Sequence, residues 1–287
     1  MANILAYLAW NPDRVALTIP FINWPIAWYG ILFVTGIFLS YFIFFRLLSN
    51  RLYEENVVKT LPEAHHLSNF LTDRLTWYIV IAILIGARLA HVLFYDFDYY
   101  SQHPGDIIKI WQGGLASHGA GISIPIALWL FYRNYRKTIA PLHFLGLFDM
   151  ICLVVPLCGG FIRIGNFFNQ EIIGKPTEMP WGVIFLSPLE GGVIVPRHPV
   201  QLYEAAAYFV LFGILSFLYL NKKVRKWEGL TTGLLFILLF TARFFLEFFK
   251  VAQNHQFENA IILMGQWLSI PFILVGVGIL MVSRSRK

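Results

Sequence analysis

The sequence predicts an all-α polytopic membrane protein with seven transmembrane helices. Hydrophobic residues make up 57% of the 287 positions and charged residues only 13%, whereas soluble domains carry about 25% charged residues. Apolar runs long enough to cross the hydrocarbon layer as helices, which takes about 20 residues, recur along the chain. The basic residues gather in short clusters between these runs. This distribution is typical of an inner-membrane protein rather than of a nucleic-acid-binding surface.

Seven segments have the length and composition of a membrane span. They are residues 25–47, 75–95, 113–132, 141–162, 203–220, 229–249 and 262–282. The intervening segment 163–202 contains Pro176, Pro180, Pro188, Pro196 and Pro199, too many for a further span, and we expect it to be an irregular extramembrane insertion. The chain shows no convincing internal repeat, so residues 1–287 are predicted to form a single membrane domain.

The basic residues also predict the orientation of the spans. Of the 22 Lys and Arg residues, 14 follow spans one, three, five and seven, and five lie on the opposite side. Because Lys and Arg are enriched in cytoplasmic loops, the N-terminus is predicted to lie outside and the C-terminus in the cytoplasm. The insertion then lies on the outer face.

The remaining three basic residues, Arg88, Arg163 and Arg243, lie within or at the end of spans. An arginine at mid-membrane costs at least about 2.5–3.5 kcal/mol, so each one requires an explanation. Arg243 could simply pair with Glu247, four residues later on the same helix face. Arg88 could serve helix packing, which the nearby Gly86 also favours. These structural roles stay open beside functional ones.

The predicted orientation brings unusual polar residues from five helices to one depth. At 1.5 Å rise per residue, all of them lie within about 10 Å of the outer face. Arginines with asparagine amides suit an anionic phosphate, because the guanidinium binds phosphate oxygens as a bidentate fork. A histidine there can exchange a proton near neutral pH. The set comprises Tyr29, Arg88, His118, Arg163, Asn166, Asn169, Glu171, Arg243 and Glu247.

The sequence contains no metal or cofactor signature. His65 and His66 are adjacent, which is poor spacing for one shared metal ion, and Cys152 and Cys158 have no partners at ligand spacing. Nucleotide-binding and nucleophile-elbow motifs are also missing from the sequence. We therefore expect neither a metal nor a cofactor.

The pattern Arg163-x-Gly165-Asn166-Phe167-Phe168-Asn169-x-Glu171-x-x-Gly174 resembles the signature of the bacterial prolipoprotein diacylglyceryl transferases. The resemblance covers most of the chain, and the order and spacing of its blocks make it specific. The further blocks are Trp28-Tyr29-Gly30, Gly86-Ala87-Arg88-Leu89, Gly113-Gly114-Leu115 with His118-Gly119, residues 197–204, residues 243–249 and residues 264–271.

The resemblance implies an enzyme of the bacterial inner membrane with its active site toward the periplasm. Such an enzyme moves the diacylglyceryl group of phosphatidylglycerol onto the lipobox cysteine of a prolipoprotein signal peptide and releases glycerol phosphate. We also expect no cofactor, no nucleic-acid partner, contact with membrane lipids and a monomer. The family's functional positions fall here on Tyr29, His118, Arg163, Asn166, Asn169, Glu171, Gly174, Arg243 and Glu247.

We expect Arg163 and Arg243 to hold the phosphate and His118 to act as a base or to position the thiol. The other mapped residues and Arg88 are expected to bind substrate, although Arg88 could also contact only neighbouring helices. The chain departs from the family at Ile162, usually glycine, at Leu239, commonly tyrosine, and at Lys250, often arginine. A transporter for an anionic lipid or solute, or a non-catalytic scaffold, are the alternatives. The inner halves of the spans carry almost no charge, which disfavours a transport path.

Overall fold

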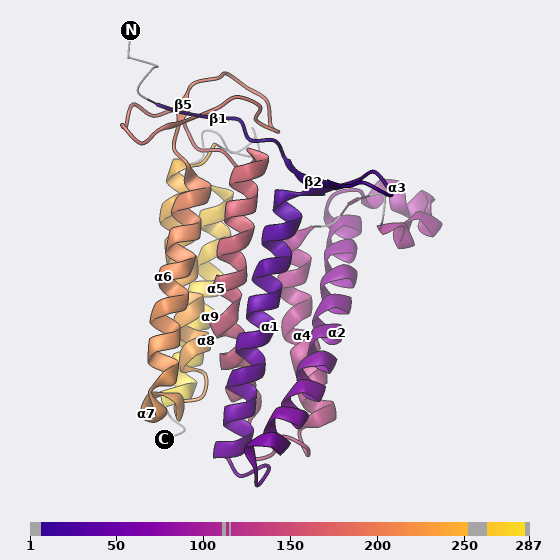
Figure 1. The fold of residues 1–287 in the computed structure, drawn as a ribbon, viewed down its shortest axis with the longest axis vertical. Helices are drawn as coiled ribbons and strands as arrows, with labels where there is room; N and C mark the ends of the chain where they lie inside the picture. Colours follow the sequence, from indigo (N-terminus) through magenta and orange to yellow (C-terminus); the bar gives the residue numbers. More distant parts are fainter. Residues whose placement is uncertain (1–6, 111–112, 115, 252–262, 285–287) are drawn as a thin grey trace. The chain divides into compact units, whose positions relative to one another are not determined.

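Figure 1 shows the computed structural model, which describes residues 7–110, 113–114, 116–251 and 263–284. The chain divides into two compact units. Unit 1 comprises Met1–Phe42 with Asp149–Lys287, and unit 2 comprises Ile43–Phe148. Helices α1 (Trp28–Glu54) and α5 (Phe144–Asn169) each contribute residues to both units.

A long helix forms most of each segment that was predicted to span the membrane. Besides α1 and α5, these helices are α2 (Leu61–Phe94), α4 (Ser117–Tyr135), α6 (Val200–Leu220), α8 (Leu230–Leu246) and α9 (Met264–Arg284). Within the described residues, six helices are long and apolar enough to cross a membrane, and α4, which begins with small and polar residues, is not among them. The protein is therefore mostly helical and multi-pass. The seventh span and the orientation stay predictions.

Two helices extend well beyond the predicted spans. Helix α2 begins at Leu61, where Thr60 Oγ1 accepts from the Glu63 amide at 3.4 Å and the Glu63 carboxylate accepts from the Lys59 amide at 3.2 Å. This arrangement is a variant of the capping box, in which the Glu63 carboxylate accepts from the residue before the N-cap Thr60, and it starts the helix independently of any membrane. Helix α5 continues past residue 162 to Asn169, so the first seven residues of the predicted insertion are helical.

Short strands make the fold less purely helical than predicted. In unit 1, β1 (Leu8–Trp10), β4 (Val183–Phe185) and β5 (Pro196–Arg197) form one sheet, with β4 parallel to β1 and antiparallel to β5. Strands β2 (Val15–Ile19) and β3 (Trp24–Ala27) form a hairpin. Phe167, Ile173, Val183 and Phe185 make a buried cluster against which Trp10 packs. The insertion that was predicted to be irregular therefore contains two short strands, β4 and β5, and a buried apolar cluster that orders them.

Close helix packing organises the rest of unit 1. Helix α8 packs against both α6 and α9. At the α8–α9 contact, Gly233 and Gly276 face each other, and a Cβ on Gly276 would lie 2.9 Å from the Gly233 carbonyl. Asp149 of α5 is buried and accepts from the Gly229 and Thr232 amides at 2.7 and 2.8 Å, so it caps the start of α8. The short helices α7 (Lys222–Arg225) and η4 (Glu247–Phe249) flank α8.

Unit 2 is built on the antiparallel pair α2 and α4, joined through α3 (Phe97–Gln102) and η2 (Pro104–Ile108). Gly86 and Gly119 touch through their backbones, so a Cβ on either would overlap the other helix. Further along the pair, Ser123 Oγ donates to the Ala82 carbonyl at 2.7 Å. Small residues at such a contact let helices approach closely in a membrane.

Candidate active site

The signature stretch consists of the last turns of α5 and a tight turn that follows them. After Asn169, the backbones of Gln170 and Ile172 take left-handed conformations, with φ of 55° and 56°. Such a conformation costs on the order of 1–3 kcal/mol for a residue other than glycine, and it recurs at functional sites. Here the turn is held from outside, because Gln170 Oε1 accepts from the Ser187 amide and Glu190 Oε1 accepts from the Ile172 amide, each at 2.8 Å.

This turn directs Glu171 back toward α5 and closes a chain of polar side chains. Glu171 Oε1 accepts from Asn166 Nδ2 at 2.7 Å and from Asn169 Nδ2 at 3.2 Å. Asn166 Oδ1 in turn accepts from Arg163 Nη1 at 3.2 Å. Gln201 of α6 donates to the Glu171 carbonyl at 2.7 Å, which ties the turn to the next helix. Arg163, Asn166, Asn169 and Glu171 therefore form one hydrogen-bonded unit.

A fully buried carboxylate, Glu204 of α6, connects this unit to the other cations. Glu204 Oε2 lies 2.9 Å from Arg163 Nε, and Glu204 Oε1 lies 2.8 Å from Lys250 Nζ. Lys250 Nζ also lies 3.3 Å from Glu247 Oε2. Arg243 interacts electrostatically with Glu204 and Glu247 and makes a side-chain hydrogen bond to Tyr208. Two cations thus contact one buried carboxylate directly, and Arg243 interacts electrostatically with the same group.

Two glycines leave room for this arrangement. A Cβ on Gly265, at the start of α9, would overlap the Glu247 carboxylate. A Cβ on Gly174 would overlap the His198 carbonyl. Gly174 also forms a β-bridge with Lys250, and the Lys175 amide donates to the Phe249 carbonyl at 2.8 Å. The end of the signature therefore lies directly beside the cation that approaches Glu204.

Tyr29, in the first turn of α1, belongs to the same cluster. A Cβ on Gly165 would come within 2.8 Å of the Tyr29 ring, so this glycine allows the ring to pack on α5. Tyr29 also interacts electrostatically with Glu171 and Arg163. Unit 1 thereby brings together most of the residues that the sequence predicted, namely Tyr29, Arg163, Asn166, Asn169, Glu171, Gly174, Arg243 and Glu247.

Arg88 belongs to unit 2 and is buried among backbone carbonyls. Its guanidinium donates to the carbonyls of Asp106 at 2.6 Å, Ile107 at 2.7 Å, Gly113 at 2.7 Å and Gly114 at 3.1 Å. The guanidinium carbon also lies 4.9 Å from the centroid of the Tyr100 ring. Four of its five N–H groups are thus used to hold the segment that leads into α4.

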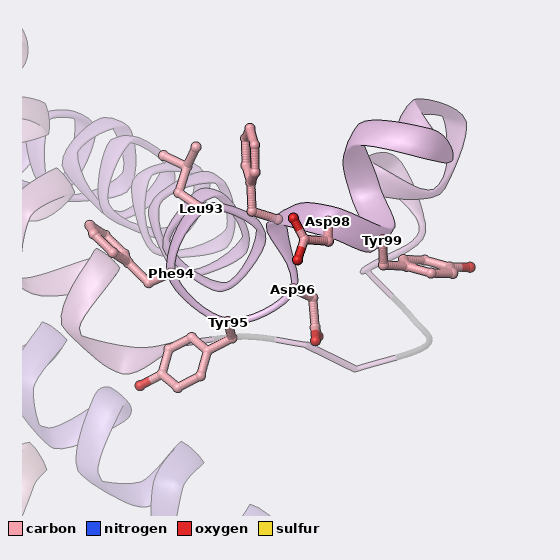
Figure 2. A pocket seen from close by; sticks show the side chains of 7 residues that line it. Leu93, Phe94, Tyr95, Asp96, Asp98 and Tyr99 are labelled. Atoms are coloured by element: carbon pink, nitrogen blue, oxygen red, sulfur yellow. The ribbon is translucent and has the colours of Figure 1, made fainter.

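His118 also belongs to unit 2 and lies in the first turn of α4, but its side chain is outside the described part of the structure. The predicted role as a base stays a prediction. In the described ranges, no three His, Cys, Asp or Glu side chains gather in a way that could hold a metal ion. A hollow of about 370 Å³ at the end of α2 is lined by the consecutive residues 93–99, outside the predicted site. In Figure 2, Phe94 and Tyr95 extend to one side of the helix end and Tyr99 extends to the other.

Sequence reasoning missed Glu204 and treated Lys250 only as a departure from the family pattern. The signal that marked the arginines, a charged side chain in or beside an apolar segment, marks both of these residues as well. Glu204 is an acid in the first turns of an apolar helix, and an intramembrane acid usually has a basic partner. Tyr208 lies one turn further along α6 and gave no signal of its own, because a tyrosine near a span end is typical of an interfacial belt.

Comparison with known proteins gives a consistent result. The family model described as prolipoprotein diacylglyceryl transferase matches residues 14–282. A relative named phosphatidylglycerol–prolipoprotein diacylglyceryl transferase, from Tolumonas auensis, is 43% identical over 98% of this chain and 99% of its own length. Proteins of the same name from Chlamydia trachomatis (42% identical, 97% and 99% covered) and Protochlamydia amoebophila (38% identical, 95% and 94% covered) also match. The chain therefore belongs to the prolipoprotein diacylglyceryl transferase family.

Proposed function

We propose that this protein transfers the diacylglyceryl group of phosphatidylglycerol to the lipobox cysteine of prolipoproteins. The observation that carries the proposal is that Arg163 and Lys250 contact one buried carboxylate, with which Arg243 also interacts electrostatically, within a chain that belongs to this family. Fixed cations at this place suit a reaction in which negative charge builds up on a phosphate.

The reaction is a displacement at carbon. The cysteine thiol has an ordinary pKa of about 8.5 and must lose its proton to become an effective nucleophile. The thiolate attacks the glyceryl carbon that carries the phosphate ester. The carbon–sulfur bond forms as the carbon–oxygen bond breaks, and the electron pair of the broken bond stays on the oxygen of the departing glycerol phosphate. His118 is the proposed acceptor of the thiol proton.

Arg163 and Arg243 are the proposed phosphate ligands. Arg163 uses Nε for Glu204 and Nη1 for Asn166, which leaves Nη2 free of partners among the described residues. The interactions that hold the guanidinium plane therefore leave one of its nitrogens for an incoming oxygen. Such preorganisation lowers the barrier because the donors need not reorient during the reaction.

The other residues of the signature are proposed to shape this phosphate site. Asn166 and Asn169 fix Glu171, and Glu247 shares Lys250 with Glu204. Tyr29 packs against Gly165 of α5, and Gly174 pairs with Lys250 at the end of the signature. Arg88 is proposed to position the segment before α4 rather than to bind substrate, because its N–H groups already serve backbone carbonyls.

We further propose a seven-span monomer in the bacterial inner membrane, with α4 as the third span. The N-terminus and the 163–202 insertion then lie on the periplasmic side and the C-terminus in the cytoplasm, in accordance with the distribution of Lys and Arg. A membrane-impermeant thiol reagent tests this topology. In intact spheroplasts it should label Glu178→Cys and should label Lys226→Cys only after lysis; the reverse pattern would contradict the orientation.

The activity is tested with purified protein, phosphatidylglycerol and a lipobox peptide. Mass spectrometry should show the peptide gaining one diacylglyceryl group, and a peptide with serine in place of the cysteine should gain none. Arg163→Ala should abolish the product. If the folded protein modifies no peptide but moves anionic lipid across vesicle membranes, the transporter alternative replaces the enzyme.

A further inference from the structure

Helices α2 and α4 enclose a long groove in unit 2. Its volume is about 790 Å³, and its lining runs from Arg74 to Phe94 on α2 and from Gly119 to Leu130 on α4. Figure 1 shows these helices running side by side along their length. The groove shares no residue with the cluster around Glu204.

The sequence pattern of the two helices builds this groove. Small residues recur every four positions at the contact, as Ala82, Gly86 and Ala90 on α2, and they bring the backbones close together. Large side chains one position away stay exposed on either side, including Ile85 of α2 and Ile126 of α4, with 54% and 53% of their surfaces accessible. The result is a narrow apolar channel between two rows of bulky side chains.

The groove is polar only at the Arg74 end. Within it, the hydroxyl of Ser123 is already satisfied by the Ala82 carbonyl. At the Arg74 end, the guanidinium contacts the ring of Phe70 at 5.3 Å and makes no ion pair within the described residues. Nearby, the Tyr78 hydroxyl accepts from Asn134 Nδ2 at 2.6 Å, which leaves its own proton for another acceptor. An apolar channel that ends in a free cation and a hydroxyl donor fits an amphiphile with an anionic head.

The half of the groove next to Arg74 is long enough for one lipid chain. On α2 the whole groove, from Arg74 to Phe94, rises about 30 Å at 1.5 Å per residue, and its half nearest the cation, from Arg74 to Ile85, rises about 17 Å. This rise is close to half of the roughly 30 Å hydrocarbon layer, which is the depth of one leaflet.

We propose that this groove binds an anionic phospholipid of the cytoplasmic leaflet, with the phosphate at Arg74, a donor from Tyr78, and an acyl chain lying between α2 and α4. The choice of the cytoplasmic leaflet rests on the orientation proposed above. The placement of the head group at Arg74 and of the acyl chain along the apolar lining rests on the groove itself. The site is separate from the substrate site, and its occupant is not consumed. A phospholipid wedged there would support the α2–α4 pair, whose outer end carries His118.

The test is a local quenching titration on the full-length protein in phosphatidylcholine nanodiscs. A bimane label on Ile126→Cys reports on the groove, and the same label on Val210→Cys of α6, which is 61% exposed and outside the groove, serves as the reference. Phosphatidylglycerol with brominated chains should quench the groove label at a lower mole fraction than brominated phosphatidylcholine does. At Val210→Cys, the two brominated lipids should quench the label at equal mole fractions.

The variants separate a specific site from general charge attraction. Arg74→Gln in the labelled protein should raise the mole fraction of phosphatidylglycerol needed for half-quenching about five-fold, as expected for one basic residue at an anionic lipid surface. Arg133→Gln is the matched control, because Arg133 stacks on Trp129 at 5.6 Å and does not line the groove. Equal losses in the two variants, or no preference for phosphatidylglycerol, would overturn the proposal. The Arg74→Gln protein should still modify the lipobox peptide. The result of the transferase assay is therefore independent of whether the groove binds lipid.

Discussion

Replacing Glu204 by glutamine tests how the cations of the site are held. Glu204 is fully buried and lies 2.9 Å from Arg163 Nε and 2.8 Å from Lys250 Nζ. Glutamine keeps the shape of the side chain but removes the negative charge that both cations share. Breaking a buried ion pair from one side costs about 3–5 kcal/mol, because the partner charge stays buried without compensation. We expect the lower end of this range, since the amide oxygen can still accept from one cation.

The effect on the reaction should exceed the effect on binding. Without the carboxylate, Arg163 loses the contact that fixes its guanidinium plane, and a misplacement of about 1 Å can cost on the order of 100-fold in rate. The uncompensated cations should still attract the anionic lipid. The turnover number should therefore fall about 100-fold, whereas the KM for phosphatidylglycerol should stay the same or decrease. Initial rates of peptide modification at several lipid mole fractions separate the two parameters.

Thermal unfolding supplies the second readout and the control. Added phosphatidylglycerol should raise the unfolding temperature of Glu204→Gln more than that of the unmodified protein, because the lipid phosphate replaces the missing negative charge. Glu178→Gln, an exposed change in the insertion, should leave rate and stability unchanged. If Glu204→Gln loses stability but retains its turnover number well below its unfolding temperature, Glu204 is only structural and the positioning argument fails.

Four further substitutions test other parts of the account. Arg163→Lys should remain at least 100-fold impaired in the peptide assay, because lysine lacks the planar fork; near-normal turnover would exclude that geometry. His118→Gln should slow transfer most at neutral pH, and the rate should recover as the pH approaches the pKa of the free cysteine thiol. An unchanged pH profile would show that His118 is not the base. Gly265→Ala should impair turnover by displacing the Glu247 carboxylate, which a normal rate would contradict. Asp149→Asn should lower the unfolding free energy by about 1–2 kcal/mol through the cap of α8, with little change in initial rate.

The sequence predicted the membrane helices well because their signal is long and local. Apolar runs such as Ile31–Phe45 and Leu230–Phe240 are helical as expected. The helix ends were less predictable, because α2 begins at a capping box outside the apolar run and α5 continues through polar residues to Asn169. The strands were missed because two to five residues carry too short a hydrophobic pattern to identify.

The sequence predicted which residues belong to the site but not which contacts join them. Arg163 and Arg243 stood out because a cation is costly in an apolar segment, and in the structure both interact with one carboxylate. That the carboxylate is Glu204 depends on how α5, α6 and α8 pack, which no local pattern specifies. The left-handed backbones of Gln170 and Ile172 were equally hidden, because neither residue type favours that conformation.

The central claim is that the site stabilises a departing phosphate while sulfur attacks carbon. Phosphatidylglycerol with ¹⁸O in the bridge between the diacylglyceryl carbon and phosphorus tests it directly. With the purified protein and a lipobox peptide, mass spectrometry should find all the label in the released glycerol phosphate and none in the thioether peptide. Labelled diacylglycerol among the products would show that the phosphorus–oxygen bond breaks instead, and would contradict the proposed roles of Arg163 and Arg243.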